Sequence, residues 1–341
     1  MPERRDLDWK NLGFAYLRPR LRFQAVWDGE WSAGELTEES TLTIEEGACG
    51  LHYGQQCFEG LKAFSAPDGS AHLFRPEMNG KRMARTAERL LMEPVPQELF
   101  LRGVRECVAA NLDLLPPHGH GASLYVRPLL IGVGDNLGLR PAPRYVFRVF
   151  CSPVGPYFKG GQTGVHLVVT DLDRAAPNGT GAYKAGGNYA GALLATKRAK
   201  ALGFDEALFL DAREHRYLEE AGSANVYGII AGHPATLVTP DSPSILPSVT
   251  MDSVLTLARE DLGLKVERRP VALEEVAGFS EMACTGTAAG IAPVARVRHT
   301  EGEVTFNPCP GPISTELYRL LSGIQRGLLP DPRGWRVPVA G

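Results

Sequence analysis

The sequence predicts an α+β fold in two domains, and three observations lead to this prediction. Segments with strand composition and segments with helical periodicity are mixed along the chain without a regular alternation of one strand and one helix. A glycine-rich, proline-marked stretch over residues 155–187 interrupts this pattern near the middle of the chain. The 341 residues, 44% of them hydrophobic and 22% charged, are enough for two globular domains of ordinary size.

Strands dominate the first half of the chain. The short apolar runs at 21–27 and 72–75 lie beside the turn signals Asp28-Gly29 and Asp68-Gly69, which is typical of hairpins. Apolar residues at helical spacing predict a helix over 80–92, and a second helical stretch covers 97–115. The segments 123–133 and 144–155 return to branched and aromatic residues and are predicted strands.

Strands and helices are both predicted in the second half. Strands are expected at 165–171, 206–211 and 235–239, a hairpin at 215–230, and helices over 189–202 and from Val249 onward. We therefore predict a small N-terminal α/β domain over 1–159, a linker region over 160–181 and a C-terminal domain over 182–341.

Charge and composition restrict the class of partner. The net charge of −3 and the sequence pI near 6.3 argue against a dedicated nucleic-acid surface and against a polybasic membrane anchor. The first residues mix both signs of charge, and no run of about eighteen apolar residues occurs. The six cysteines are scattered without metal-ligand spacing, so we expect reduced, mostly buried thiols and no metal. These features predict a cytoplasmic protein that acts on small molecules.

Lys184 is the first candidate for covalent chemistry. It is followed by Ala185, Gly186 and Gly187, so that a bulky group can approach its amine. A lysine amine condenses with an aldehyde, and in pyridoxal phosphate enzymes the lysine lies where small residues leave room for the planar ring. The alternative is an ordinary lysine in an exposed loop, and this stretch alone does not exclude it.

Pyridoxal phosphate needs donors for its phosphate, and one helix start is a candidate. Pro247 and Ser248 precede a helical run, so the amides of Val249 and Thr250 are placed to bind an anion. A plain capped helix would have the same sequence. The run of small and hydroxyl residues at 284–290 is open to two interpretations as well, an anion-binding loop or a close backbone contact.

The cofactor also needs a carboxylate at its ring nitrogen and a cation at its phosphate. Glu219 and Glu220 lie beside small residues, although an acidic pair in this position is commonly a solvated turn. Arg82, Arg85 and Arg89 share one helical face, and such a charged face is commonly solvated too.

Eight motifs in the same order resemble the branched-chain aminotransferases, which are class IV aminotransferases with the fold-type IV (D-amino acid aminotransferase-like) architecture. They are "LHYGQQCFEGLKAF", "FRPEMNGKRMARTAERL", "SLYVRPLLIGVGDNLGL", "CSPVGPYFKGG", "GAYKAGGNYAGALLATKRA", "YLEEAGSANVYG", "ILPSVTMDSVL" and "TGTAAGIAPV". Together they span most of the chain, which makes the resemblance highly specific.

The resemblance implies a pyridoxal 5'-phosphate enzyme with assigned cofactor residues. Lys184 would be the Schiff-base lysine and proton shuttle, and Tyr189 would hydrogen-bond the phenolic oxygen of the ring. Glu220, rather than Glu219, would face the ring nitrogen, because the family motif is Glu, one residue, Gly. The phosphate would be bound by Arg82, Val249, Thr250 and Thr287, the second and third through their backbone N–H groups.

The resemblance also implies a substrate pocket. Thr287 and Ala288 match the loop that binds the substrate α-carboxylate, and Arg127 matches the position associated with the distal carboxylate of glutamate. Further residues placed at the substrate are Tyr16, Tyr53, Phe58, Tyr125, Leu137, Leu139, Tyr157 and Ser223, with Asn225 in the same hairpin. Tyr53, Phe58, Leu137 and Leu139 would be supplied partly across the interface of a homodimer.

The activity implied is reversible transamination of branched-chain L-amino acids with 2-oxoglutarate. The rival activities within the fold are those of a D-amino acid aminotransferase or an aminodeoxychorismate lyase, and the rival of another class is a binding protein with a decayed site. One departure from animal members is that residues 289–292, Ala-Gly-Ile-Ala, replace a CxxC pair. Reversible thiol regulation of that kind is therefore not expected.

Overall fold

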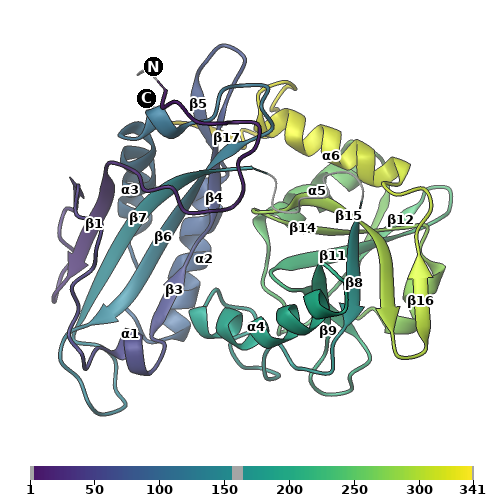
Figure 1. The fold of residues 1–341 in the computed structure, drawn as a ribbon, viewed down its shortest axis with the longest axis horizontal. Coiled ribbons are helices and arrows are strands. Elements are labelled where there is room, and N and C mark those ends of the chain that lie inside the picture. Colours follow the sequence, from purple (N-terminus) through teal and green to yellow (C-terminus); the bar gives the residue numbers. More distant parts are fainter. Residues whose placement is uncertain (1–3, 156–163, 340–341) are drawn as a thin grey trace. The chain divides into compact units, whose positions relative to one another are not determined.

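The computed structural model describes residues 4–155 and 164–339 (Figure 1). Two compact units form within it. Unit 1 gathers Met1–Tyr157, Tyr183–Gly187 and Ile324–Gly341, and unit 2 gathers Phe158–Ala182 and Asn188–Gly323. Helices and strands are both abundant, as the α+β prediction requires.

Unit 1 is built on an antiparallel sheet. Its main path runs in the order β17-β5-β4-β6-β7-β1-β2, and β3 pairs with β6. The strands are β1 (Arg22–Trp27), β2 (Glu35–Thr37), β3 (Gln56–Phe58), β4 (Leu61–Ser65), β5 (Ala71–Phe74), β6 (Ser123–Val133), β7 (Arg144–Val154) and β17 (Arg336–Pro338). The helices are α1 (Cys49–His52), α2 (Pro76–Arg89) and α3 (Gln97–Ala109).

The side chains of β6 point alternately to the two faces of this sheet, and the two faces differ in burial. Leu124 and Val126 point to the side covered by α2 and α3, where they join Met83 and Val104 in the main core of the unit. Tyr125, Arg127 and Leu129, which alternate with these core positions, are on the opposite face and are only partly buried. One face of the sheet is therefore core, and the other is free to line a site.

Unit 2 contains a mixed sheet that closes on itself. The path β10-β9-β8-β15-β14-β11 is completed by pairing of β10 with β11, and β12, β13 and β16 extend it. The strands are β8 (Val165–Val169), β9 (Glu206–Leu210), β10 (Leu218–Ala221), β11 (Ala224–Ile230), β12 (Thr236–Pro240), β13 (Lys265–Arg269), β14 (Glu281–Gly286), β15 (Gly290–His299) and β16 (Gly302–Thr305). Closure removes the free edges at β10 and β11, the hairpin that carries the two glutamates.

Among the described residues, three α-helices belong wholly or mostly to unit 2: α4 (Gly186–Ala201), α5 (Val249–Glu260) and α6 (Pro312–Gln325). Alternation on β9 separates two cores. Leu208 and Leu210 belong to the cluster inside the closed sheet, whereas Ala207 and Phe209 belong to a second cluster with α4. Because α4 presents only alanines to this cluster, it can lie close to the strand.

Most predicted elements are present with small shifts at their ends. The strand predicted over 123–133 is β6, and the hairpin predicted over 215–230 contains β10 and β11. The helix predicted over 80–92 begins earlier, at Pro76, where proline suits the first turn, and ends at Arg89. The two turn glycines, Gly29 and Gly69, have φ of 84° and 85°, which explains their place in tight turns.

The observed units differ from the predicted domain boundaries at three places. The predicted linker, residues 160–181, belongs to unit 2, and its described part contains β8. The segment Tyr183–Gly187, with Lys184, belongs to unit 1 rather than to the predicted C-terminal domain. The reason is local pairing: Ala185 forms a β-bridge with Cys57, and the Phe58 N–H donates to the Lys184 carbonyl (3.2 Å). The C-terminal residues join unit 1 as well, because β17 pairs with β5.

The six cysteines are free thiols, and all but the half-buried Cys309 are buried, as predicted. Across residues 4–155 and 164–339, no helix has the length and apolar character needed to cross a membrane.

Candidate functional site

Unit 1 holds Lys184 between α2 and β3. The Lys184 N–H donates to the hydroxyl of Thr86 on α2 (3.2 Å), and the Lys184 carbonyl accepts from Phe58 on β3. The backbone of this lysine is therefore fixed from both sides, which a lysine in a freely solvated loop would not be. Its amine lies 4.8 Å from the centroid of the Phe58 ring.

The surroundings of Lys184 make its amine a better nucleophile. Burial and the nearby Arg82 guanidinium lower the pKa of Lys184 to about 8, although the Glu59 carboxylate acts in the opposite direction. Only the neutral amine attacks a carbonyl, and a lower pKa increases the neutral fraction near pH 7. The exposed-lysine interpretation does not fit this environment.

Arg82 is held by a buried carboxylate that the sequence analysis did not single out. Its Nε and Nη2 donate to the two oxygens of Glu59 at 2.7 and 2.8 Å, and Asn79 Nδ2 donates to the same carboxylate at 2.8 Å. Burial alone would raise the pKa of Glu59, but the Arg82 charge and these hydrogen bonds hold it below its usual range. The fork of Arg82 is thereby fixed in orientation.

The other two arginines of α2 have a different environment. Arg85 and Arg89 are exposed, and their guanidinium groups lie 5.6 and 5.7 Å from the centroid of the Tyr183 ring. They therefore cover the residue before Lys184 and do not share the buried position of Arg82. Arg82 is the member of the three that is buried and paired with Glu59.

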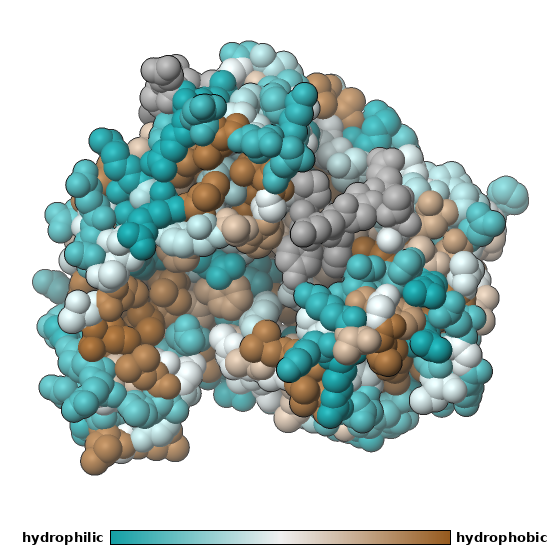
Figure 2. All heavy atoms as spheres, viewed as in Figure 1, coloured by the Kyte–Doolittle hydropathy of each residue, from teal (hydrophilic) through white to brown (hydrophobic). Residues whose placement is uncertain are grey.

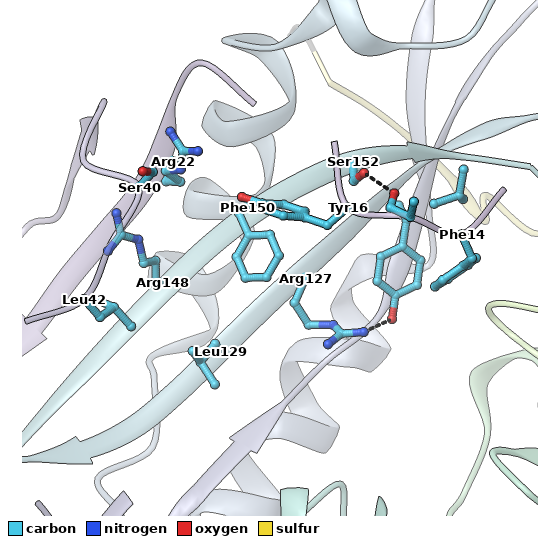
Figure 3. A pocket seen from close by; sticks show the side chains of 13 residues that line it. Phe14, Tyr16, Arg22, Ser40, Leu42, Arg127, Leu129, Arg148, Phe150 and Ser152 are labelled. Carbon is cyan, nitrogen blue, oxygen red and sulfur yellow. Dashed lines mark hydrogen bonds between the residues drawn. The ribbon is translucent and has the colours of Figure 1, made fainter. Parts of the chain in front are cut away.

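A cavity of about 510 Å³ opens on the face of the unit 1 sheet that the helices leave uncovered (Figure 3). Its lining includes three of the predicted substrate residues, Tyr16, Tyr125 and Arg127. Arg127 Nη2 donates to the Tyr125 hydroxyl (3.1 Å), and its guanidinium lies 4.6 Å from the Phe58 ring centroid. Its Nε is buried and has no hydrogen-bond partner among the described residues, so the cavity can still take an anion there.

The residues predicted to reach across a dimer interface fall into two groups. Leu137 and Leu139 are 91% and 87% exposed, and the Tyr53 hydroxyl donates to the Leu137 carbonyl (2.6 Å). Phe58, in contrast, contacts Lys184 and Arg127 of its own chain. Phe58 thus contributes to the site of its own chain, on strand β3, which is paired with β6. Tyr157, another predicted pocket residue, lies outside the described residues.

Unit 2 buries Glu220 at the end of β10. One oxygen accepts from the Leu246 N–H (2.6 Å) and from Asn225 Nδ2 (3.4 Å), and the other lies 3.3 Å from Arg174 Nη1. Arg174 itself donates hydrogen bonds to the carbonyls of Gly181 and Ser244. The carboxylate is therefore in a fixed position beside a buried cation, which favours its ionised form.

Glu219 differs from its neighbour although both are buried. Successive residues of a strand point to opposite faces, and Glu219 accepts a hydrogen bond from the Ser242 hydroxyl (2.9 Å) instead. Burial raises its pKa above the usual range. Neither glutamate is in a solvated turn, so that alternative for the pair is wrong, and of the two only Glu220 forms the ion pair with Arg174.

The predicted phosphate donors of unit 2 lie at a helix start and in a hairpin loop. Val249 and Thr250 are the first residues of α5, where backbone N–H groups lack partners within the helix. Ser248 caps the helix by accepting from the Met251 N–H (3.1 Å). Thr287 and Ala288 form the partly exposed loop between β14 and β15. Both sites present backbone amides that suit an anion.

The remaining predicted residues of unit 2 are Tyr189 and Ser223. Tyr189 is half-buried in the first turns of α4, five residues after Lys184. Ser223 is exposed in the turn between β10 and β11, which begins at Gly222 with φ of 57°. Asn225 of the same hairpin is buried and donates to the Leu246 carbonyl (3.1 Å) as well as to Glu220.

Sequence reasoning missed Glu59 and Arg174, the residues that fix Arg82 and Glu220. Glu59 lies in the quoted motif "CFEGLKAF", and a charged residue within an apolar stretch is a signal that could have found it. Arg174 lies in a glycine- and proline-rich stretch without periodicity, and its role depends on the fold of 241–246 around it. No sequence spacing indicates that pairing.

Comparison with known proteins gives consistent matches. The family model described as amino-transferase class IV matches residues 56–297. A branched-chain-amino-acid aminotransferase of Helicobacter pylori is 50% identical over 98% of this chain and 98% of its own. A crystal structure of the Escherichia coli branched-chain amino acid aminotransferase has a TM-score of 0.79 and 25% identity, covering 94% of this chain and 100% of that one. A T.th. branched-chain amino acid aminotransferase with pyridoxamine 5'-phosphate has a TM-score of 0.81 and 26% identity, covering 95% and 100% of the two chains.

Proposed function

Since the chain belongs to the class IV aminotransferase family, we propose that it transfers the amino group reversibly between branched-chain L-amino acids and 2-oxoglutarate, with pyridoxal 5'-phosphate as cofactor. Relatives that match over nearly the full length are named for this activity. The observation that carries the proposal is the half-buried Lys184, which is fixed through its backbone and has a lowered pKa, together with the Glu59–Arg82 pair beside it.

The residues present fit this cofactor. Lys184 supplies a nucleophilic amine, Arg82 and the start of α5 supply a cation and amides for a phosphate, and Glu220 supplies an ionised carboxylate for a ring nitrogen. When bound, pyridoxal phosphate supplies an aldehyde that takes up the amino group and a ring that accepts the electron pair left on the substrate Cα. We assign Tyr189 to the phenolic oxygen of the ring and Thr287 to the phosphate.

Lys184 then acts as the general base and acid. With the cofactor bound, its amine would take the proton from the substrate Cα and return it at C4′ of the cofactor. A pKa of about 8 suits both steps near neutral pH, because the amine can be neutral before the transfer and charged after it. Phe58 covers one side of the amine and excludes water there.

Glu220 would hold the ring nitrogen of the bound cofactor in its protonated form, in which the ring can accept electrons. Its carboxylate stays ionised because Arg174 lies 3.3 Å away and the Leu246 N–H donates to it. Glu219 cannot replace it, because it accepts from Ser242 and its pKa is raised.

Arg127 accommodates two substrates that differ by a full charge. Its guanidinium lies against the faces of the Phe58 and Tyr125 rings and donates to the Tyr125 hydroxyl, so its charge is stabilised when an aliphatic side chain is bound. Its Nε remains available to the distal carboxylate of glutamate. We assign the α-carboxylate to the loop of Thr287 and Ala288, and we place Tyr16 and Ser223 beside the substrate.

We further propose a homodimer. The side chains of Leu137 and Leu139 are almost fully exposed, and exposed apolar side chains of this size on a short loop favour burial against a second chain. Tyr53 fixes this loop through the Leu137 carbonyl. The cytoplasmic location expected from the sequence stays a prediction.

A panel of L-amino acids and D-amino acids, each offered with 2-oxoglutarate to the purified holoenzyme, tests the proposal. We expect turnover with leucine, isoleucine and valine and formation of L-glutamate. Turnover confined to D-amino acids would favour the rival aminotransferase, and pyruvate release from aminodeoxychorismate would favour the lyase. Bound cofactor with no turnover of any of these would indicate a binding protein.

A further inference from the structure

The cavity on the unit 1 sheet has a second basic end, away from Arg127. Figure 3 shows Arg22, Ser40 and Arg148 at one side of the cavity and Arg127 with Phe14 at the other. Arg22 on β1 and Arg148 on β7 are 3% and 4% exposed and lie on neighbouring, paired strands. None of the roles proposed above uses them.

The partners of these two arginines are neutral. Arg22 Nη1 donates to the carbonyls of Arg20 (3.1 Å) and Glu38 (3.2 Å), and Arg148 donates to those of Thr41 (2.6 Å) and Glu39. The Glu39 carboxylate is occupied elsewhere, by the N–H and hydroxyl of Thr41. Within the described part of the chain, neither arginine takes part in a salt bridge, and Arg22 Nη2 is buried with no hydrogen-bond partner.

Two buried cations that form no salt bridge within the described part of the chain are only partly compensated, because Glu39 acts on Arg148 from a distance. Burial and the charge of Arg22 lower the pKa of Arg148, against the opposing effects of Glu39 and Tyr16. A buried, unpaired charge is costly, and a bound anion would remove this cost while giving Arg22 Nη2 an acceptor. Arg22 Nη2 is therefore a hydrogen-bond donor that no protein group satisfies and that a bound anion can use.

The space between the two basic ends is apolar. Leu42, Leu129 and Phe150 line it, and Tyr16 lies edge-on to Phe150 with ring centroids 5.5 Å apart. Figure 2 shows hydrophobic side chains gathered over this part of unit 1, where Figure 1 labels β6 and β7. A ligand that fills this space carries an apolar body as well as its negative group.

We propose that the Arg22–Arg148 end binds the carboxylate of a small organic acid whose aliphatic body of a few carbons lies against Phe150 and Leu129. This site is separate from the Arg127 end, which the proposed function assigns to the distal carboxylate of a substrate. It does not depend on the transamination chemistry, so a loss of catalysis and a loss of this site are distinguishable.

The test is equilibrium binding of sodium hexanoate to the holoenzyme, measured by isothermal titration, with hexanamide and inorganic phosphate as comparison ligands. To remove the contribution of the Arg127 end, the titrations are also carried out in an Arg127→Met background. We expect hexanoate to bind in this background and hexanamide and phosphate to bind much more weakly, because each lacks one of the two features of the site. Absence of hexanoate binding there, or equal binding of phosphate, would overturn the proposal.

Variants locate the site. Arg148→Met in the same background should weaken hexanoate binding about ten- to a hundredfold, the loss expected for a charge-assisted hydrogen bond. Arg105→Met, which removes an exposed arginine of α3, is the matched control and should have no effect. If Arg148→Met does not fold, Leu42→Trp decides instead: it narrows the cavity, keeps both arginines and should also abolish binding. Unchanged binding in both variants would place hexanoate elsewhere and overturn the proposal.

Discussion

Each unit of the molecule buries a glutamate–arginine pair, and the two pairs are built for opposite purposes. In unit 1, the Glu59 carboxylate accepts hydrogen bonds of 2.7 and 2.8 Å from Arg82. Both of its oxygens therefore serve to orient the Arg82 guanidinium. In unit 2, Arg174 approaches Glu220 only to 3.3 Å and donates to the Gly181 and Ser244 carbonyls. There the cation keeps the carboxylate ionised.

The difference shows which member of each pair faces the chemistry. A bidentate pair fixes geometry, whereas a looser pair supplies charge and leaves the carboxylate able to accept a further donor. Under the proposed function, Arg82 is the member that meets the ligand in unit 1, and Glu220 is that member in unit 2. Substitutions in each unit test this difference.

The largest effect is expected at Glu220. Replacing Glu220 by Gln removes the charge that keeps a ring nitrogen protonated, so the turnover number should fall by several orders of magnitude while the cofactor stays bound. The matched control is Glu219→Gln, which should change turnover little, because the Glu219 side chain accepts from Ser242 and its pKa is already raised. Steady-state kinetics and the visible absorbance of each purified variant would check this. The reverse order of damage would assign the catalytic role to Glu219.

A smaller and more selective effect is expected at Arg127, a cation of unit 1 that has no carboxylate partner among the described residues. Arg127→Met should lower kcat/KM for glutamate and 2-oxoglutarate about ten- to a hundredfold, which is the contribution of one charge-assisted hydrogen bond. The half-reaction of leucine should change much less, because no charge is lost from its contacts. Single-turnover kinetics on each substrate measures the two half-reactions separately. An equal fall in rate for leucine and glutamate would show that Arg127 has a structural role.

At Glu59 the expected effect is a change in the pKa of Lys184. The Glu59 carboxylate raises the pKa of Lys184, so Glu59→Gln should lower that pKa below its value of about 8. In the cofactor-free protein, the pH at which Lys184 becomes half reactive toward an amine reagent should fall accordingly. Peptide mapping of the modified lysine over a pH series would follow it. A midpoint that stays the same or rises would contradict the assigned influence of Glu59.

The smallest effect is expected from oxidation. Residues 289–292 contain no thiol, and Cys284 is fully buried in β14, where burial raises its pKa and keeps it protonated. Mild peroxide should therefore leave activity unchanged. A loss that dithiothreitol reverses would require a reactive thiol that these surroundings do not provide.

The sequence predicted the strands and helices well where periodicity is strong and local. Branched and aromatic residues predicted a strand over 123–133, and β6 has these bounds. The first residues of α5 were predicted from Pro247 and Ser248, and the structure places Ser248 as the cap. Lys184 was singled out by the small residues that follow it.

What the sequence did not predict depends on contacts between distant segments. Glu59, which follows β3, pairs with Arg82 of α2. Arg174 donates a hydrogen bond to the carbonyl of Ser244, seventy residues away in the chain. The assignment of residues 183–187 to unit 1 follows from the bridge between Ala185 and Cys57 and from the backbone hydrogen bonds of Lys184. Neither composition nor spacing records such pairings, because they arise only when the sheet has formed.

The central claim is that Lys184 carries the cofactor, and unit 1 contains a competitor with similar properties. Burial, with the charge of Arg326, also lowers the pKa of Lys62 to about 8. Reduction of the holoenzyme with borohydride fixes the cofactor on the lysine that carries it, and peptide mapping then identifies that lysine. We expect the label on Lys184, and none after Lys184→Ala. A label on Lys62 in the wild-type protein would contradict the account.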